Sequence, residues 1–179
     1  MTDTLVQQPS YNTQRLFLRP IRKSDAGLIS VHAADVRVAQ MTAVIPHPLP
    51  PGVTEAFIET SMSADRTEDV WVMDGSEQGH AEVIGLISLN RMDRGQSEIG
   101  YWVAPAFWGT GFASEALAVL IEANPHNNSR IFGQVFQDNP GSARVLMNAG
   151  FEYLGDAEAF CIARNAVVQT WTYSKAIEQ

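Results

Sequence analysis

The sequence predicts an α+β fold in which helices flank one mixed, mostly antiparallel sheet of about seven strands. Short β-rich runs lie between Val70 and Val103 and are separated by turn dipeptides, whereas apolar residues from Phe112 to Ile121 recur at helical spacing. No internal repeat or linker interrupts the 179 residues. The elements therefore follow the order βααβββαβαββ within one domain.

Composition excludes several classes of protein. Charged residues make up 18% and apolar residues 45% of the chain, which favours a globular core over disorder. The formal net charge of −8, with Lys23 and Lys175 as the lysines, disfavours nucleic acid as a partner. The single Cys161 and the spacing of the histidines predict no disulfide and no structural metal. We expect neither a membrane span nor a secretion signal, and therefore a cytoplasmic location.

The chain is expected to begin with a flexible tail over residues 1–12, because no periodic apolar pattern is present there. A single domain is then expected over residues 13–179. The alternating run Arg15–Arg19, which ends at a proline, predicts the first strand.

Two helices and a proline-rich crossing are predicted next. Ser24 or Asp25 is expected to cap the first helix. Thr54 is expected to cap the second, whose apolar face includes Met62. Four prolines between Met41 and Gly52 exclude regular structure in the segment that joins the two helices.

Strands and helices alternate in the second half of the chain. After three strands in a meander, a glycine-rich turn leads into a helix that carries Phe112 and stops at Asn124. A strand over Ile131–Phe136 and a helix from Pro140 to Gly150 follow. Two further strands are predicted at Phe151–Leu154 and Val167–Ser174.

The most informative segment is the turn Trp108-Gly109-Thr110-Gly111-Phe112-Ala113 between a strand and a helix. Its glycines permit positive φ and close approach of a ligand, and the amides at a helix start attract anions. The turn therefore fits a phosphate or diphosphate, and it equally fits a tight turn without a ligand. No Gly-Lys-Ser/Thr is present, which excludes a Walker-type loop. Ser114 fits a dinucleotide fingerprint poorly, and Asp138 is the remaining support for one.

Several motifs together resemble the GNAT superfamily of acetyl-coenzyme A-dependent N-acetyltransferases, in particular its RimJ/RimL-like branch. They are Arg15-Leu16-Phe17-Leu18-Arg19-Pro20, Glu98-Ile99-Gly100-Tyr101-Trp102, the glycine turn continued to Ala116, and Asn139 through Ser142 to Gly150-Phe151. The resemblance covers roughly residues 13–176 and implies a GNAT-like sheet with splayed fourth and fifth strands. This chain departs from the family at Ala106, where the superfamily has Gln or Arg, and at Thr110, where the branch often has a basic residue.

The resemblance implies that acetyl-coenzyme A is the cosubstrate and that no metal takes part. The residues that it assigns to coenzyme binding come from the strand before the turn, the turn itself and the next strand–helix junction: Trp102, Val103, Trp108, Gly109, Thr110, Gly111, Phe112, Ala113, Asn139 and Ser142. A backbone N–H near Val103, freed by the splay, is implied to stabilise the oxyanion. Asn139 also fits a helix cap, and Ser142 an ordinary first-turn residue.

The resemblance also implies which residues carry the catalysis. Glu98 is the expected general base, acting directly or through a water if burial raises its pKa, and an ion pair with Arg19 or Arg91 is the structural alternative. Ser142 is the candidate acid for the departing sulfur. Leu146 stands where other branches use a tyrosine for that step.

These observations favour an N-acetyltransferase that moves an acetyl group to a primary amine, either a protein N-terminus or a small-molecule amine, by direct attack in a ternary complex. The crossing Met41–Pro51 and the second helix are implied to bind the amine. A non-catalytic acyl-coenzyme A-binding or sensing module on the same fold and a nicotinamide-dinucleotide enzyme remain as alternatives. No G-x-S-x-G is present, which excludes a hydrolase of that type. The protein is expected to be a monomer or homodimer with no nucleic-acid or membrane partner.

Overall fold

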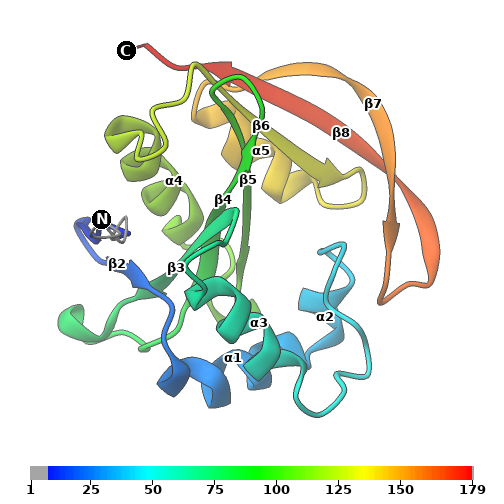
Figure 1. The fold of residues 1–179 in the computed structure, drawn as a ribbon. Coiled ribbons are helices and arrows are strands. Elements are labelled where there is room, and N and C mark those ends of the chain that lie inside the picture. Colours follow the sequence, from blue (N-terminus) through cyan, green and yellow to red (C-terminus); the bar gives the residue numbers. More distant parts are fainter. Residues whose placement is uncertain (1–7, 179) are drawn as a thin grey trace.

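The computed structural model describes residues 8–178, which form one eight-stranded sheet with helices on both faces (Figure 1). The strands are β1 (Tyr11–Asn12), β2 (Phe17–Pro20), β3 (Glu68–Asp74), β4 (Gly85–Met92), β5 (Gln96–Val103), β6 (Arg130–Phe136), β7 (Glu152–Cys161) and β8 (Ala166–Ala176). The helices are α1 (Ala26–Ala33), α2 (Val36–Ala39), α3 (Val53–Met62), α4 (Phe112–Ala123) and α5 (Pro140–Asn148), with 3₁₀ turns η1 (Lys23–Asp25), η2 (Ser76–Gln78) and η3 (Pro105–Phe107). No helix in this part of the chain has the length and apolar run needed to cross a bilayer.

The sheet is mixed and mostly antiparallel, as predicted. Its strand order is β1-β2-β3-β4-β5-β6-β8-β7, and β5 and β6 are the parallel neighbours. Within residues 8–178 it has one strand more than the sequence predicts, because β1 pairs with β2 through Tyr11 opposite Leu18. The α+β fold class is therefore confirmed.

Residues within the predicted N-terminal tail make contacts with the sheet. The indole of Trp71 donates to the Pro9 carbonyl at 2.8 Å, and β1 follows directly. A side-chain hydrogen bond and strand pairing therefore hold Pro9, Tyr11 and Asn12 against the sheet, within the segment where a tail is predicted. Residues 1–7 lie outside the described residues.

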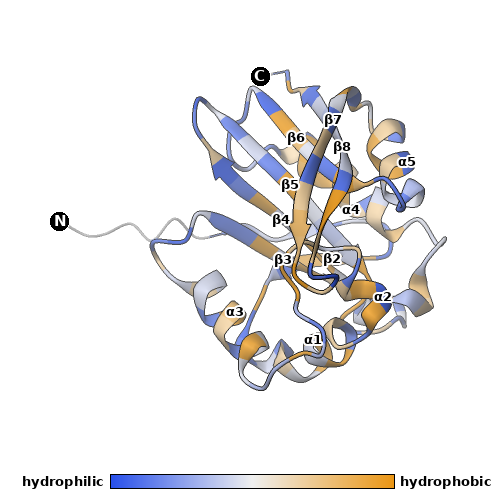
Figure 2. Ribbon diagram, turned by 90° about the vertical axis from the view of Figure 1, so that its right-hand side faces the viewer, coloured by the Kyte–Doolittle hydropathy of each residue, from blue (hydrophilic) through white to orange (hydrophobic). Residues whose placement is uncertain are grey.

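Alternation along the strands divides the core into two clusters, one on each face of the sheet. On one face, Trp71 of β3 packs with α4 and α5, which contribute the buried Leu117 and Leu146. On the other face, Val72 packs with α1 and α3, and this second cluster is smaller. Figure 2 shows hydrophilic residues at the start of β3 and the end of β4. The smaller cluster therefore leaves polar side chains of the central strands uncovered.

One of the two predicted helix starts differs in the structure. The N-cap of α3 is Gly52, with a φ of 83°, whereas Thr54 is buried within the first turn. Asp25 is the N-cap residue of α1, as predicted, but its side chain makes no capping hydrogen bond and its carboxylate binds the buried guanidinium of Arg19 at 2.8 Å. Met62 is 47% exposed, so the apolar face of α3 ends earlier than predicted.

A buried polar network ties the α4–β6 connection to the sheet. His126 Nε2 lies 2.7 Å from Asp69 Oδ2, and its Nδ1 lies 2.9 Å from Ser97 Oγ. Burial desolvates Asp69, but hydrogen bonds from His126 and Arg66, with the charge of Arg91, outweigh that cost and lower the pKa of Asp69 to about 2. Ser97 is 0% exposed. This Ser–His–Asp arrangement therefore stabilises the sheet and offers no accessible nucleophile.

The β5–β6 pair opens partway along its length. Parallel pairing runs from Gln96–Arg130 to Ile99–Gly133. Beyond that point β5 continues to Val103 and β6 to Phe136 without pairing with each other, although β5 stays paired with β4 and β6 with β8. The predicted splay is confirmed. It lies between the fifth and sixth strands because β1 adds one to the count.

Candidate active site

The turn between β5 and α4 has the backbone conformation that its glycines allow. Gly109 and Gly111 have φ values of 73° and 83°, and Gly111 is the N-cap of α4. The amide N–H groups from Gly109 to Ala113 donate to no acceptor within residues 8–178. A run of such donors at the positive end of a helix is an arrangement that binds phosphate groups.

Arg15, from the segment before β2, supports this turn. Its Nη2 donates to the Thr110 carbonyl at 3.0 Å, its Nε pairs with Glu115 at 2.8 Å, and its Cζ lies 4.1 Å from the centre of the Phe112 ring. Because a trans peptide is planar, the Thr110 carbonyl held by Arg15 directs the N–H of Gly111 to the opposite side. Arg15 therefore orients one donor of the turn, a role that the sequence analysis missed.

Side chains of the turn bond to neighbouring backbone groups of the protein. The indole of Trp108 donates to the Val103 carbonyl at 2.7 Å, and the hydroxyl of Thr110 donates to the Phe107 carbonyl. Phe112 is 3% exposed and belongs to the core under α4. The groups left to meet a ligand are consequently main-chain amides.

The part of β5 that is not paired with β6 adds a further main-chain donor. The Ala104 N–H donates to the Ile84 carbonyl, on the side of β4. Backbone groups alternate in direction along a strand, so those of Tyr101 and Val103 point towards β6. Beyond Ile99 they meet no strand partner among the described residues. The Val103 N–H therefore lies at the opening between β5 and β6, where the sequence analysis expects an oxyanion to be stabilised.

The start of α5 faces this opening from the other side. Asn139 caps α5, and its side-chain oxygen accepts the Ser142 N–H at 3.4 Å. The Ser142 hydroxyl donates to the Tyr101 hydroxyl at 3.0 Å, and the Tyr101 hydroxyl donates to the Ser142 carbonyl at 2.8 Å. Burial raises the pKa of Tyr101 to about 12, so this hydroxyl stays protonated. Tyr101 was not singled out from the sequence, although it lies within the Gly100-Tyr101-Trp102 motif and on the face opposite Glu98.

Glu98 lies on the α1/α3 face of β5. The same face carries Trp102, and the side chain of Trp102 packs against the smaller core cluster. Desolvation raises the pKa of Glu98 above its ordinary value, although the side chain is reachable from solvent. The ion-pair alternative is wrong, because Arg19 and Arg91 bind other carboxylates. Glu98 is thus an unpaired carboxylate suited to accepting a proton.

A second carboxylate lies across the sheet from Glu98. Register places Glu68, Asn90 and Glu98 side by side on β3, β4 and β5, on one face. The hydroxyl of Ser88 lies 3.4 Å from Glu68 Oε2. Desolvation, followed by repulsion from Glu98, raises the pKa of Glu68. Glu68 could not be predicted from the sequence, because only the strand register brings it to Glu98.

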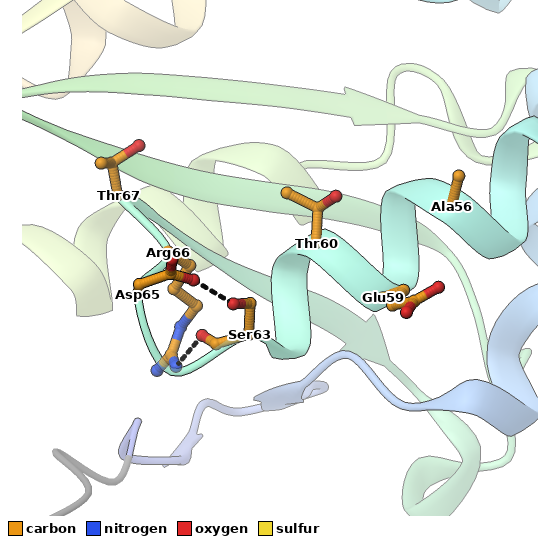
Figure 3. Close-up of a pocket in the computed structure, with 7 residues that line it drawn as sticks. All are labelled: Ala56, Glu59, Thr60, Ser63, Asp65, Arg66 and Thr67. Atoms are coloured by element: carbon orange, nitrogen blue, oxygen red, sulfur yellow. Dashed lines mark hydrogen bonds between the residues drawn. The ribbon is translucent and has the colours of Figure 1, made fainter.

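A surface pocket of about 520 Å³ opens beside the last turns of α3 (Figure 3). It is lined by Ala56, Glu59, Thr60, Ser63, Asp65, Arg66 and Thr67. Ser63 donates to Asp65, and Arg66 donates to the Ser63 carbonyl at 3.1 Å. The lining ends one residue before Glu68 and contains none of the predicted catalytic or coenzyme-binding residues. Three of its residues, Ala56, Glu59 and Thr60, belong to α3, the helix expected to bind the amine.

Comparison with known proteins gives one consistent similarity. Residues 15–152 match the family model described as acetyltransferase (GNAT) domain. The chain is 28% identical over 177 residues to the uncharacterized N-acetyltransferase p20 of Bacillus licheniformis, covering 90% of this chain and 93% of that protein. It is 36% identical over 89 residues to the ribosomal-protein-serine acetyltransferase of Escherichia coli (strain K12), covering 42% and 50%. The microcin C7 self-immunity acetyltransferase MccE, solved with acetyl-CoA and AMP, has a TM-score of 0.82 at 19% identity, with coverage of 98% of this chain and 100% of that chain.

Proposed function

The chain belongs to the GNAT acetyltransferase family, and from this premise we propose that it transfers an acetyl group from acetyl-coenzyme A to a cationic primary amine by direct attack in a ternary complex. The observation that carries the proposal is the opening of β5 and β6 beyond Ile99–Gly133. The amides from Gly109 to Ala113, which have no acceptor among residues 8–178, lie at the start of α4. Glu98 lies on the α1/α3 face of β5, the opposite face of the sheet. A thioester held at the opening is accessible to an amine that approaches from the α1/α3 face.

Main-chain groups are proposed to hold the coenzyme. The amides from Gly109 to Ala113 bind its diphosphate, and Arg15 keeps the turn in shape. Asn139 contacts the pantetheine arm while capping α5. The positions Trp102, Trp108 and Phe112 contribute through the backbone and through packing. Ala106 and Thr110, the departures from the family pattern, then affect affinity less than a change in the glycines does.

The reaction requires a neutral amine. The ammonium group of the acceptor gives a proton to Glu98, whose raised pKa makes it a better acceptor of that proton. The amine nitrogen then attacks the thioester carbon, and the Val103 N–H stabilises the negative charge on the oxygen. As the tetrahedral intermediate collapses, the C–S bond breaks and the C–N bond remains. The attacking nitrogen gives its extra proton to the departing sulfur, so the products are a neutral amide and the coenzyme thiol.

The departing thiolate is proposed to meet the hydroxyls at the start of α5. Ser142 is the donor to the sulfur, with Tyr101 beside it. The pKa of Tyr101, about 12, lies well above the ~8.5 of a simple thiol, so the hydroxyl pair stabilises the thiolate by hydrogen bonding and does not have to give up a proton completely. Ser142 therefore assists departure of the leaving group.

Charge supports a cationic acceptor. Glu68 and Glu98 face the same side of the sheet, and the chain as a whole carries −8. A peptide N-terminus or a small amine has the required positive charge. The similarity to a ribosomal-protein-serine acetyltransferase supports the peptide, without deciding between the two.

The test is release of the coenzyme thiol from acetyl-coenzyme A in the presence of amines. The panel contains peptides with N-terminal Ser or Ala, spermidine and lysine, and mass spectrometry identifies the product that gains an acetyl group. We expect release with at least one amine and its loss in Glu98→Gln. Coenzyme binding without release from any amine contradicts the proposal and indicates a binding or sensing module. A rise in melting temperature with NADH instead of acetyl-coenzyme A indicates the dinucleotide alternative.

A further inference from the structure

Arg164, in the turn between β7 and β8, contacts two segments that are distant from it in sequence. Its Nε donates to the Gln40 carbonyl at 2.8 Å. Its Nη1 and Nη2 donate to the two carboxylate oxygens of Asp138 at 2.6 and 3.0 Å. One planar guanidinium therefore joins the segment after α2 to the loop between β6 and α5.

The hairpin around Arg164 holds the same segment at neighbouring points. The Ile162 N–H donates to the Ala43 carbonyl at 3.0 Å, and the thiol of Cys161 donates to the Thr42 carbonyl at 3.1 Å. Figure 1 shows the tip of the β7–β8 hairpin reaching the chain that leaves α2. The backbone carbonyls of Gln40, Thr42 and Ala43 are thus bonded to the hairpin.

The two segments joined by Arg164 lie on opposite sides of the proposed reaction. Asp138 directly precedes Asn139, the cap of α5, and Ser142 lies one turn further on. Gln40 directly precedes the crossing Met41–Pro51, where the acceptor is expected. A shift of Arg164 therefore changes the distance between the leaving-group side and the acceptor side.

We propose that Arg164 is a positioning residue that fixes the acceptor segment relative to the start of α5. This inference rests on the proposed function, because it concerns where the acceptor lies during transfer. The forked guanidinium is required, since a lysine ammonium cannot bind both Asp138 oxygens and the Gln40 carbonyl in the same geometry.

The contacts are too exposed to contribute much to stability. Arg164 and Asp138 side chains are 23% and 54% exposed, and such ion pairs contribute about 0–1 kcal/mol to folding. The guanidinium also lowers the pKa of Asp138, so the pair stays charged near neutral pH. Removing Arg164 should therefore leave the protein folded and alter its kinetics.

The test compares Arg164→Gln and Arg164→Lys with Arg144→Gln. Arg144 is an exposed residue of α5 with no bonded partner among residues 8–178, so its substitution removes the same charge nearby. We expect Arg164→Gln to lower kcat/KM for the amine by about tenfold or more, because small displacements of a bound reactant are costly. The KM for acetyl-coenzyme A should change by less than about twofold, and the melting temperature should be retained. Arg164→Lys should restore only part of the loss.

The proposal is overturned if kcat/KM for the amine is unchanged in a folded Arg164→Gln, if both substrates are affected equally, or if Arg144→Gln has the same effect. If Arg164→Gln does not fold, Asp138→Asn removes the forked contact from the other side and is expected to give the same split between the two substrates. Failure of the proposed function has a different signature, since the unmodified protein then acetylates no amine.

Discussion

The two sides of the proposed site consist of different chemical groups, main-chain amides on one and charged side chains on the other. The coenzyme side is mostly main chain, taken from one continuous stretch between Val103 and Ala113. The acceptor side consists of charged side chains from separate elements, with Glu68 on β3, Glu98 on β5 and Arg164 on the β7–β8 hairpin. Substitutions on the coenzyme side should therefore change the affinity for acetyl-coenzyme A, and substitutions on the acceptor side should change the kinetics with the amine. Under the proposed function, backbone conformation should decide coenzyme binding at the turn, and side-chain chemistry should decide acceptor binding on the opposite side.

The largest expected effect is on the acceptor side, at Glu98. Glu98→Gln keeps the shape of the side chain and removes the proton acceptor, so kcat should fall by about 10²–10⁴-fold. In the unmodified protein, kcat/KM should decrease as the pH falls through the raised pKa of Glu98, because the protonated carboxyl cannot accept a proton. The measurement is a pH profile of thiol release.

The Glu98 variant also has an internal control. Its affinity for acetyl-coenzyme A should stay within about twofold, since the turn binds through backbone amides. An unaltered kcat in Glu98→Gln assigns the base to another group. A parallel loss of coenzyme affinity contradicts the separation of the two sides.

The next effect is on stability and concerns Asp69, whose buried hydrogen-bond network lies on the face of β3 opposite Glu68. Asp69 follows Glu68 on β3 and points to the opposite face, into the network with His126. Its pKa falls from an ordinary 3.8 to about 2, so the network contributes stability above pH 3.8 that is lost as the pH falls through about 2. That shift corresponds to about 2 kcal/mol in the free energy of unfolding.

Asp69→Asn should therefore lower the free energy of unfolding by about 2 kcal/mol at neutral pH, with the difference narrowing towards pH 2. Urea unfolding from pH 2 to 7 measures it. Asp93→Asn, an exposed aspartate with no bonded partner among the described residues, is the matched control and should change stability by less than about 0.5 kcal/mol. A pH-independent difference contradicts the assignment to Asp69.

On the coenzyme side, the decisive test separates conformation from volume. Gly109 has a φ of 73°, and a Cβ built on it meets nothing within 4 Å. Asn tolerates this conformation and Val does not, so Gly109→Val should weaken acetyl-coenzyme A binding by about tenfold, the equivalent of the ~1–2 kcal/mol cost of left-handed backbone. Gly109→Asn should remain within about threefold. Calorimetry measures both, and equal losses in the two variants indicate a steric cause instead.

The same contrast explains what sequence could reveal. The glycine turn and α4 follow from adjacent residues and were predictable from local patterns, whereas the splay was predicted from the family resemblance alone. Glu68 and Arg164 reach the site through strand register and hairpin geometry, for which the sequence carries no local signal. The helix α2 was missed because it is one turn long and starts with an Asp35 cap in a segment without apolar periodicity. The side-chain hydrogen bonds of Trp108 and Thr110 to the Val103 and Phe107 carbonyls also have no local sequence signal, because they depend on how the turn folds.

The smallest expected effect is at Glu68, and it tests whether the acceptor side works through charge. Glu68→Gln removes one of two carboxylates without altering the proposed base, so kcat should change little while KM for a cationic amine rises about three- to tenfold. The increase should be greater for a doubly charged acceptor than for a singly charged one, and added salt should reduce it because mobile ions screen the interaction. Glu122→Gln on the exposed side of α4 is the control, since it removes the same charge from the opposite face of the sheet. If KM rises equally for singly and doubly charged amines, the effect of Glu68 is on the conformation of β3 and not on the charge of the site. The acceptor side would then depend on backbone conformation, as the coenzyme side does.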